Sequence, residues 1–189
     1  MEQYKPAIKQ GVIMAILSIL VFLVLYAIDP MIYAKPTGWI ILLVVNFLAI
    51  PIVFIILGVR DTKKNFSYFT FGSSLAAGMV TGIVASAMVL VFNILFMTVI
   101  DPQWEQQLAE EVLVSTEEFM EKMGAPDEAI DEAMAKARED GAGKAQGIMG
   151  QAKSTLGGIG WYLVLSLIIG AIYRDKEPRV EAEVDEMGS

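Results

Sequence analysis

The chain has 189 residues, of which 55 % are apolar and 19 % charged, and its net charge is −8 because 22 acidic residues outnumber 14 basic ones. It contains neither cysteine nor histidine, which excludes a disulfide, a thiolate nucleophile and a cysteine-ligated metal and removes the commonest general base. We therefore expect no enzymatic activity, no cofactor and no metal centre, and the acidic balance argues against a nucleic-acid partner.

Charge and apolarity are segregated along the chain. Four stretches lack Asp, Glu, Lys and Arg, and each is about as long as the ~20 residues that cross a ~30 Å hydrocarbon core. They predict transmembrane helices at residues 10–28, 38–58, 74–100 and 154–173. The first stretch is followed by Asp29-Pro30 rather than by a small-residue cleavage site, so we expect a retained helix and not a signal peptide. The predicted fold is an all-α integral membrane bundle of four helices in the lipid bilayer.

The segments between these helices predict the orientation. Basic residues close to the helix ends gather in the N-terminal residues 1–9, in the aromatic and basic loop 59–73, and at the start of the acidic tail 174–189. The loop 29–37 holds a single lysine, and the segment 101–153 has no basic residue in the twenty positions after its first. The positive-inside rule therefore places both termini in the cytosol and the last two segments on the outer side.

Two asparagines lie inside the predicted bundle at similar depths. Asn46 and Asn93 are each ~10–12 Å below the outer surface, counted at ~1.5 Å per residue from the helix ends. They either bond each other across the helix interface or line a path for a solute or ion. Near them Pro51 lacks an N–H, so we expect a kink in the second helix and a carbonyl of Phe47 without its helical donor.

The third helix carries small residues four positions apart. They are Ser74, Gly78, Gly82 and Ser86. Such a stripe allows two helix backbones to approach closely in lipid. The partner is either another helix of the same bundle or a second copy of the chain in a homo-oligomer.

The long segment 101–153 predicts an amphipathic helical hairpin on the outer side. Its first helix follows Asp101-Pro102 and has an apolar stripe at helical spacing, consisting of Trp104, Leu108, Val112, Phe119 and Met123. Gly124 ends this helix, a second begins near Pro126, and a glycine-rich tether is expected from Gly141 to the fourth transmembrane helix. The stripe is a candidate surface for a protein partner. The segment has 13 acidic residues and five basic ones. The acidic residues form either a solvated face or a surface that binds cations or a partner.

The order of motifs resembles a known family. Gly58-Val59-Arg60-Asp61 is followed by Phe66-Ser67-Tyr68-Phe69-Thr70-Phe71-Gly72 and by Gly78, and the third helix ends in Ile100-Asp101-Pro102. This pattern is similar to the domain of unknown function 4199 over most of the chain. The resemblance implies a small four-helix membrane protein of the Bacteroidota inner membrane, whose outer side faces the periplasm. It implies no established activity.

Three classes of function remain. We expect a non-enzymatic accessory or scaffold protein that binds a partner through its outer hairpin. The alternative is a small oligomeric transporter or channel with a polar site near Asn46 and Asn93. An enzyme would have to use the acidic residues at the membrane boundaries (Asp29, Asp61, Asp101 and Asp175), and all four are placed as helix caps.

Overall fold

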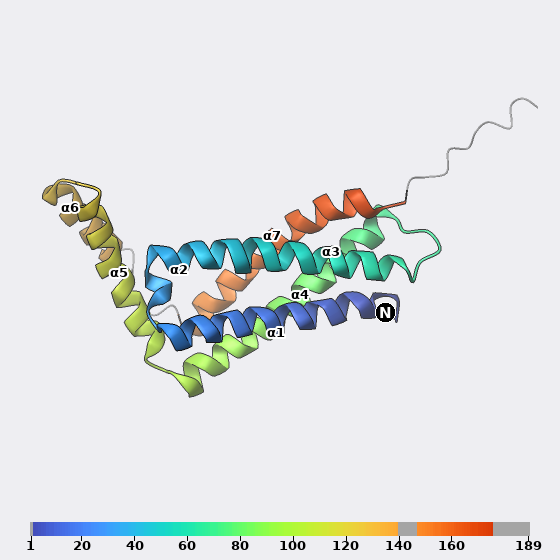
Figure 1. Ribbon diagram of the computed structural model, residues 1–189, viewed down its shortest axis with the longest axis horizontal. Helices are drawn as coiled ribbons and strands as arrows, with labels where there is room; N and C mark the ends of the chain where they lie inside the picture. Colours follow the sequence, from blue (N-terminus) through green and yellow to red (C-terminus); the bar gives the residue numbers. More distant parts are fainter. Residues whose placement is uncertain (1, 140–146, 176–189) are drawn as a thin grey trace, which may run out of the picture.

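The computed structural model describes residues 2–139 and 147–175, and within these residues the chain is helical with no strand (Figure 1). The longest elements pack side by side as a bundle of four helices. In chain order these are α1 (Lys5–Ile28), the continuous helix α2 (Pro36–Ile41), η3 (Leu42–Ala49) and α3 (Ile50–Lys63), then α4 (Phe71–Leu95) with η4 (Phe96–Ile100), and finally α7 (Gly147–Tyr173). Two short 3₁₀ turns, η1 (Glu2–Tyr4) and η2 (Ile32–Ala34), precede α1 and α2.

A helical hairpin projects from one end of this bundle. It consists of α5 (Trp104–Lys122) and α6 (Asp127–Glu139), which pack on each other. Figure 1 shows that this end, the hairpin end, also holds the connection between α1 and α2. The start of α1, the α3–α4 connection and the end of α7 lie together at the opposite end, the termini end.

The four bundle helices are long and apolar enough to span a membrane. They are 27 to 30 residues long. In the most apolar 18-residue stretch of each helix, only 17–22 % is buried inside the chain. The outward side chains are large and apolar, as at Val24, Ile40, Val91 and Ile172, each more than half exposed. In water such a surface would be costly, whereas in lipid it needs no cover. The fold is therefore that of a multi-pass membrane protein.

All four bundle helices extend beyond the charge-free stretches that predicted them. Residues 147–153, expected as part of a flexible tether, belong to α7, and residues 5–9 belong to α1. Polar residues are tolerated where a membrane helix leaves the hydrocarbon, so a rule that stops at the first charge shortens the helix. The rest of the expected tether, residues 141–146, lies outside the described residues.

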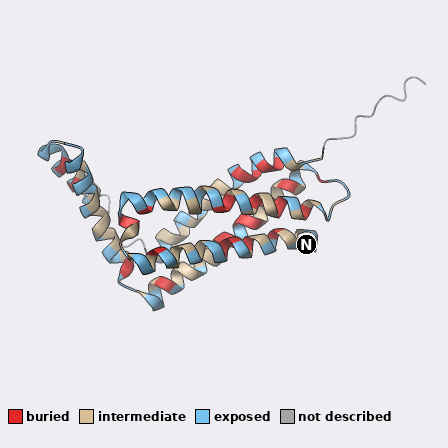
Figure 2. Cartoon of the chain, in the orientation of Figure 1, coloured by how far each residue is buried: buried red, intermediate tan, exposed pale blue. Residues whose placement is uncertain are grey.

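The buried residues form three clusters along the bundle, and Figure 2 shows them on the faces where helices meet. The cluster at the termini end consists of Ala7, Ile55, Val59, Phe69, Ala77, Leu165 and Ile169. The middle cluster consists of Met14, Ala15, Ile50 and Ala85. The cluster at the hairpin end consists of Leu25, Tyr33, Phe96 and Trp104.

The small-residue stripe of the third helix faces α7 of the same chain. A Cβ added to Gly78 would overlap the hydroxyl of Ser166 and would lie 2.8 Å from the Cβ of Ser166. A Cβ on Gly82 would lie 2.6 Å from the ring of Tyr162. Ser74 is fully buried at the same seam, beside Gly170. The glycines are thus required for close approach of α4 to α7, the partner that the sequence alone left open.

A carboxylate closes the termini end. Asp175, just beyond α7, pairs with Lys63 at 2.7 Å and accepts the backbone N–H of Phe69 at 2.7 Å. The Lys63 ammonium, and next the Phe69 N–H, hold the pKa of this carboxyl below its usual range. The aromatic loop between α3 and α4 is thereby tied to the end of α7.

Candidate functional site

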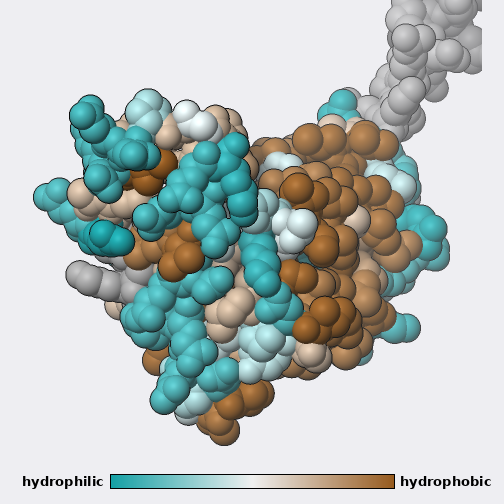
Figure 3. Space-filling model, turned by 60° about the vertical axis from the view of Figure 1, so that its left-hand side comes forward, coloured by the Kyte–Doolittle hydropathy of each residue, from teal (hydrophilic) through white to brown (hydrophobic). Residues whose placement is uncertain are grey.

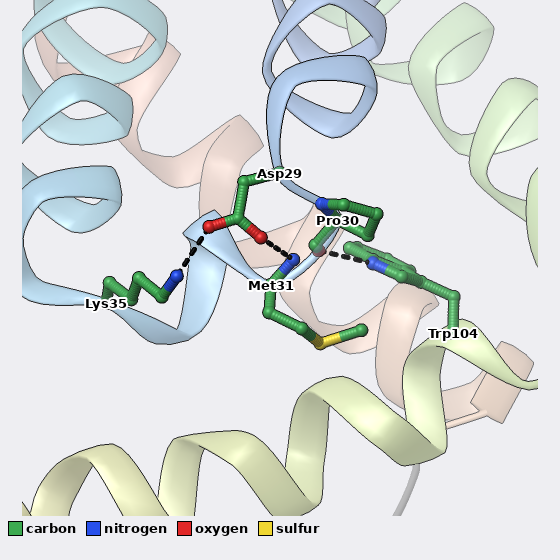
Figure 4. A network of polar contacts seen from close by, with 5 residues as sticks. All are labelled: Asp29, Pro30, Met31, Lys35 and Trp104. Carbon is green, nitrogen blue, oxygen red and sulfur yellow. Dashed lines mark hydrogen bonds and ion pairs between the residues drawn. The ribbon is translucent and has the colours of Figure 1, made fainter.

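The base of the hairpin is fixed to the bundle by one tryptophan. The side chain of Asp101 accepts the backbone N–H of Trp104 at 3.1 Å, as a helix cap does. The indole of Trp104 is 7 % exposed, and its Nε1 donates to the carbonyl of Pro30 at 2.8 Å (Figure 4). In the same turn Asp29 accepts the N–H of Met31 and pairs with Lys35, whose ammonium lowers the pKa of the Asp29 carboxyl. The turn that receives the indole is therefore itself held in place.

Aromatic rings surround this tryptophan. The rings of Phe22, Tyr26, Tyr33 and Phe96 lie edge-on to Trp104 with centroids 5.4–6.1 Å away. Tyr26 donates to Asp101 at 2.7 Å, and Tyr33 donates to the carbonyl of Phe22 at 2.8 Å. Burial raises the pKa of Tyr33. Edge-to-face pairs add to the stabilisation from area burial, so this cluster holds the start of α5 firmly.

The predicted apolar stripe of α5 divides into two parts. Trp104 belongs to the cluster at the hairpin end and Leu108 packs against it. Both residues, together with Val112, line a cavity described next. At the far end, Phe119 is 49 % exposed and Met123 is 71 % exposed. Trp104 is thus part of the fold's own core rather than an open surface. The partner-binding expectation now rests on Phe119 and Met123.

A cavity of about 550 Å³, partly open to the surface, lies in the half of the bundle next to the hairpin. All four bundle helices and α5 contribute to its wall, which is mostly apolar and aromatic. Its non-aromatic polar side chains are Ser18, Asn46, Ser86, Asn93, Gln151 and Thr155, and two tyrosines, Tyr33 and Tyr162, also line it. The described residues that line it include no Asp, Glu, Lys or Arg. Its size and lining match a site for a small, largely apolar molecule.

The two asparagines singled out by depth both line this cavity. Among the described residues, no hydrogen bond joins them, and the buried Oδ1 of Asn46 has no partner at all. A buried acceptor without a donor costs about 1–3 kcal/mol, so its persistence here calls for an explanation. Ser86 of the small-residue stripe also faces this cavity, whereas Ser74, Gly78 and Gly82 do not line it.

Asn46 lies in an unusual segment of the second helix. The stretch η3, from Leu42 to Ala49, is π-helical and ends two residues before Pro51, the residue expected to kink this helix. The carbonyl of Phe47, which an α-helix would pair with the missing N–H of Pro51, accepts the indole N–H of Trp161 at 2.9 Å instead. The rings of Phe47 and Trp161 also stack at 4.7 Å. A side chain of α7 thus satisfies the carbonyl that proline leaves free.

A second hollow of about 440 Å³ adjoins the cavity on the outside of η3. It shares Trp39, Leu42 and Asn46 with the cavity and adds Leu43 and Phe47. Trp39, Leu43 and Phe47 are 46–60 % exposed on the apolar surface of the bundle. The cavity therefore has an apolar approach from the side that lipid would cover.

The acidic residues at the helix ends are all engaged in structural contacts. Asp61 accepts a hydrogen bond from the side-chain amide of Gln10 at 3.1 Å and forms an ion pair with Lys64. The other three, Asp29, Asp101 and Asp175, hold the turns described above. Each lies beyond or at the end of a bundle helix and outside the cavity wall.

Four apolar helices of spanning length, with a central cavity and a projecting hairpin, define the chain as a multi-pass membrane protein. The family model described as "Protein of unknown function (DUF4199)" matches residues 9–175, and the chain belongs to this family. No curated protein and no solved structure matches it.

Proposed function

We propose that the chain is a non-enzymatic accessory or scaffold protein of the inner membrane that docks a partner protein through the α5–α6 hairpin. Both termini lie in the cytosol in this proposal, and the hairpin lies on the extracytoplasmic side. The basic residues Arg60, Lys63 and Lys64 support this orientation because they gather at the termini end, as the positive-inside rule requires of the cytosolic face.

The observation that carries the proposal is the contrast between the two ends of α5. Its first residue is buried and bonded to the bundle, whereas Phe119 and Met123 near its end are exposed. The helix is 19 residues long, so these side chains stand roughly 20–28 Å along its axis from the anchor. Figure 3 shows the hairpin as a hydrophilic body in front of the apolar bundle. A rigid arm that ends in exposed apolar side chains fits a docking element.

The charge of the hairpin specifies the partner's chemistry. Residues 101–139 contain 12 acidic and three basic residues, so the tip presents its apolar pair within a negative field. This charge disfavours insertion of the tip among anionic lipid headgroups. The matching surface is an apolar recess with basic residues around it, on a protein. Such a contact would form quickly at low salt and weaken as ionic strength rises.

Paired variants of the hairpin test this proposal. The tagged chain in nanodiscs is expected to recover a partner protein at a fixed ratio. In the double variant Phe119→Ser, Met123→Ser the amount of partner recovered should fall about tenfold, because the apolar anchors of the contact are lost. The matched control is Val114→Ser, which removes an equally exposed apolar side chain of α5 that lies off the stripe. Recovery is measured by quantitative mass spectrometry at two salt concentrations. Equal recovery with all three proteins, or no partner at a fixed ratio, would refute the docking role.

A second candidate function is a small oligomeric transporter or channel. It is favoured by the position of Asn46 and Asn93 in one cavity among all four helices. Against it, the buried residues of the middle and termini-end clusters pack the bundle between this cavity and the termini end. A pathway would require these clusters to open, so the described conformation fits a binding pocket better than a continuous pore.

A further inference from the structure

The glycines of the bundle differ in what surrounds them. Gly11, Gly58, Gly78 and Gly82 have no space for a Cβ, because backbone or side-chain atoms of another helix lie within 2.6 Å of its position. Gly158, on α7, has no atom within 4 Å of that position although it lines the cavity. Helix packing therefore requires glycine at the first four sites but not at Gly158. The missing side chain there leaves room inside the cavity.

The polar lining has a defined chemical requirement. The residue Asn46 lines both hollows, and its Oδ1 atom is a buried acceptor without a partner among the described residues. A ligand that donates one hydrogen bond would satisfy it. With no charged side chain in the described wall, a ligand with a buried charge would be left unpaired, which is strongly unfavourable. The matching ligand is neutral and carries a hydroxyl or amide donor.

The approach to the cavity adds a second requirement. The hollow lined by Trp39, Leu43 and Phe47 opens on the apolar surface of the bundle, which lipid would cover. A molecule that enters sideways must already be dissolved in the membrane. The apolar wall would hold its chain, and Asn46 would hold its head.

We propose that this cavity is a binding site for a neutral, lipid-soluble amphiphile with a long apolar chain and a hydroxyl or amide donor, taken up sideways from the half of the bilayer next to the hairpin. The site is independent of partner docking at the hairpin tip. Asn46 determines the preference for a donor, and Gly158 provides the space.

Photolabelling tests this proposal on the full-length chain in nanodiscs of phosphatidylethanolamine and phosphatidylglycerol. The probe is hexadecanol with a diazirine in its chain, and the reference probe is the matching hydrocarbon without a hydroxyl. We expect saturable labelling of cavity-lining peptides by the alcohol, with competition by unlabelled hexadecanol. A parallel competition with dioleoylglycerol distinguishes a single-chain alcohol from a two-chain neutral lipid as the better ligand.

Three variants make the test specific. Asn46→Leu introduces a side chain of similar size without an acceptor. It should raise the alcohol concentration needed for half-maximal labelling about five- to tenfold, while labelling by the hydrocarbon stays unchanged. Gly158→Phe should abolish labelling by both probes, because the ring occupies the cavity. Gly157→Phe is its matched control, since Gly157 is a neighbouring glycine with equally open surroundings that does not line the cavity. Gly158→Leu, a smaller change, should reduce labelling even if the phenylalanine variant fails to fold.

Two outcomes would overturn the proposal. One is labelling that never saturates and spreads over the lipid-facing residues in proportion to their exposure. The other is labelling that is the same in the Gly158 and Gly157 variants. Equal weakening of both probes by Asn46→Leu would refute the assigned role of this asparagine in recognising the donor.

Discussion

Replacing Trp104 with alanine is expected to lower the free energy of unfolding by about 3–5 kcal/mol, the usual range for truncating a buried tryptophan. The indole is 7 % exposed among four aromatic rings and donates to the carbonyl of Pro30. Its removal leaves a large void and a carbonyl without its donor at the turn between α1 and α2. Because the same residue starts α5, the hairpin should also detach from the bundle. Equilibrium unfolding in mixed micelles and limited proteolysis of residues 101–139 measure the two effects.

Two further variants separate packing from hydrogen bonding. Trp104→Phe keeps a ring in the cluster but removes the indole N–H. Loss of this hydrogen bond should account for about 1 kcal/mol of the decrease in the free energy of unfolding of this variant. Phe119→Ala removes an aromatic side chain that is 49 % exposed on the same helix, and its effect on unfolding should be small. If Trp104→Ala and Phe119→Ala destabilise the chain equally, Trp104 does not anchor the hairpin.

Replacing Gly78 with alanine is expected to destabilise the bundle by about 1–3 kcal/mol, the range for overpacking a close contact. The new methyl group would overlap the hydroxyl of Ser166 and approach its Cβ to 2.8 Å. Because α4 packs more extensively on α7 than on any other described helix, separating this seam affects the whole bundle. The same unfolding measurement reports the loss.

A double-mutant cycle tests whether the contact itself is responsible. Ser166→Gly removes both overlapping atoms, so it should restore much of the stability that Gly78→Ala loses. Ile55 Cγ2, at 3.2 Å from the added Cβ, is the neighbour that remains. Gly157→Ala is the matched control, since nothing lies within 4 Å there and no loss is expected. Additive effects at Gly78 and Ser166 would show that the two residues are not coupled.

The sequence predicted the bundle because lipid imposes a simple rule. A membrane helix needs a long stretch without charge, and the four such stretches coincide with the four helices of spanning length found in the described residues. The rule does not locate helix ends, since polar residues are stable beyond the hydrocarbon, and residues 147–153 were therefore assigned to a tether. Helical spacing likewise predicted a helix after Asp101-Pro102, and α5 begins at Trp104.

Features that depend on how helices pair could not be derived from the sequence. The spacing of Gly78 and Gly82 indicated a close helix contact, but only the structure identifies α7 as the partner. Trp104 belonged to an apolar stripe, and the sequence did not indicate which residues contact it. In the structure this tryptophan is buried against α1 and the turn that follows α1. The depths of Asn46 and Asn93 matched, whereas the cavity between them depends on side chains from five helices. The bond from Trp161 to Phe47 is likewise a tertiary contact, although Pro51 indicated that this carbonyl would need a donor.

The orientation of the hairpin is the most direct test of the account, because docking on the outer side depends on it. The chain has no cysteine, so single-cysteine variants report one position each. In spheroplasts, a membrane-impermeant maleimide should label Met123→Cys at once and label Ser67→Cys, in the exposed α3–α4 connection, only after the membrane is permeabilised. The opposite pattern would place the hairpin in the cytosol and contradict the proposed function.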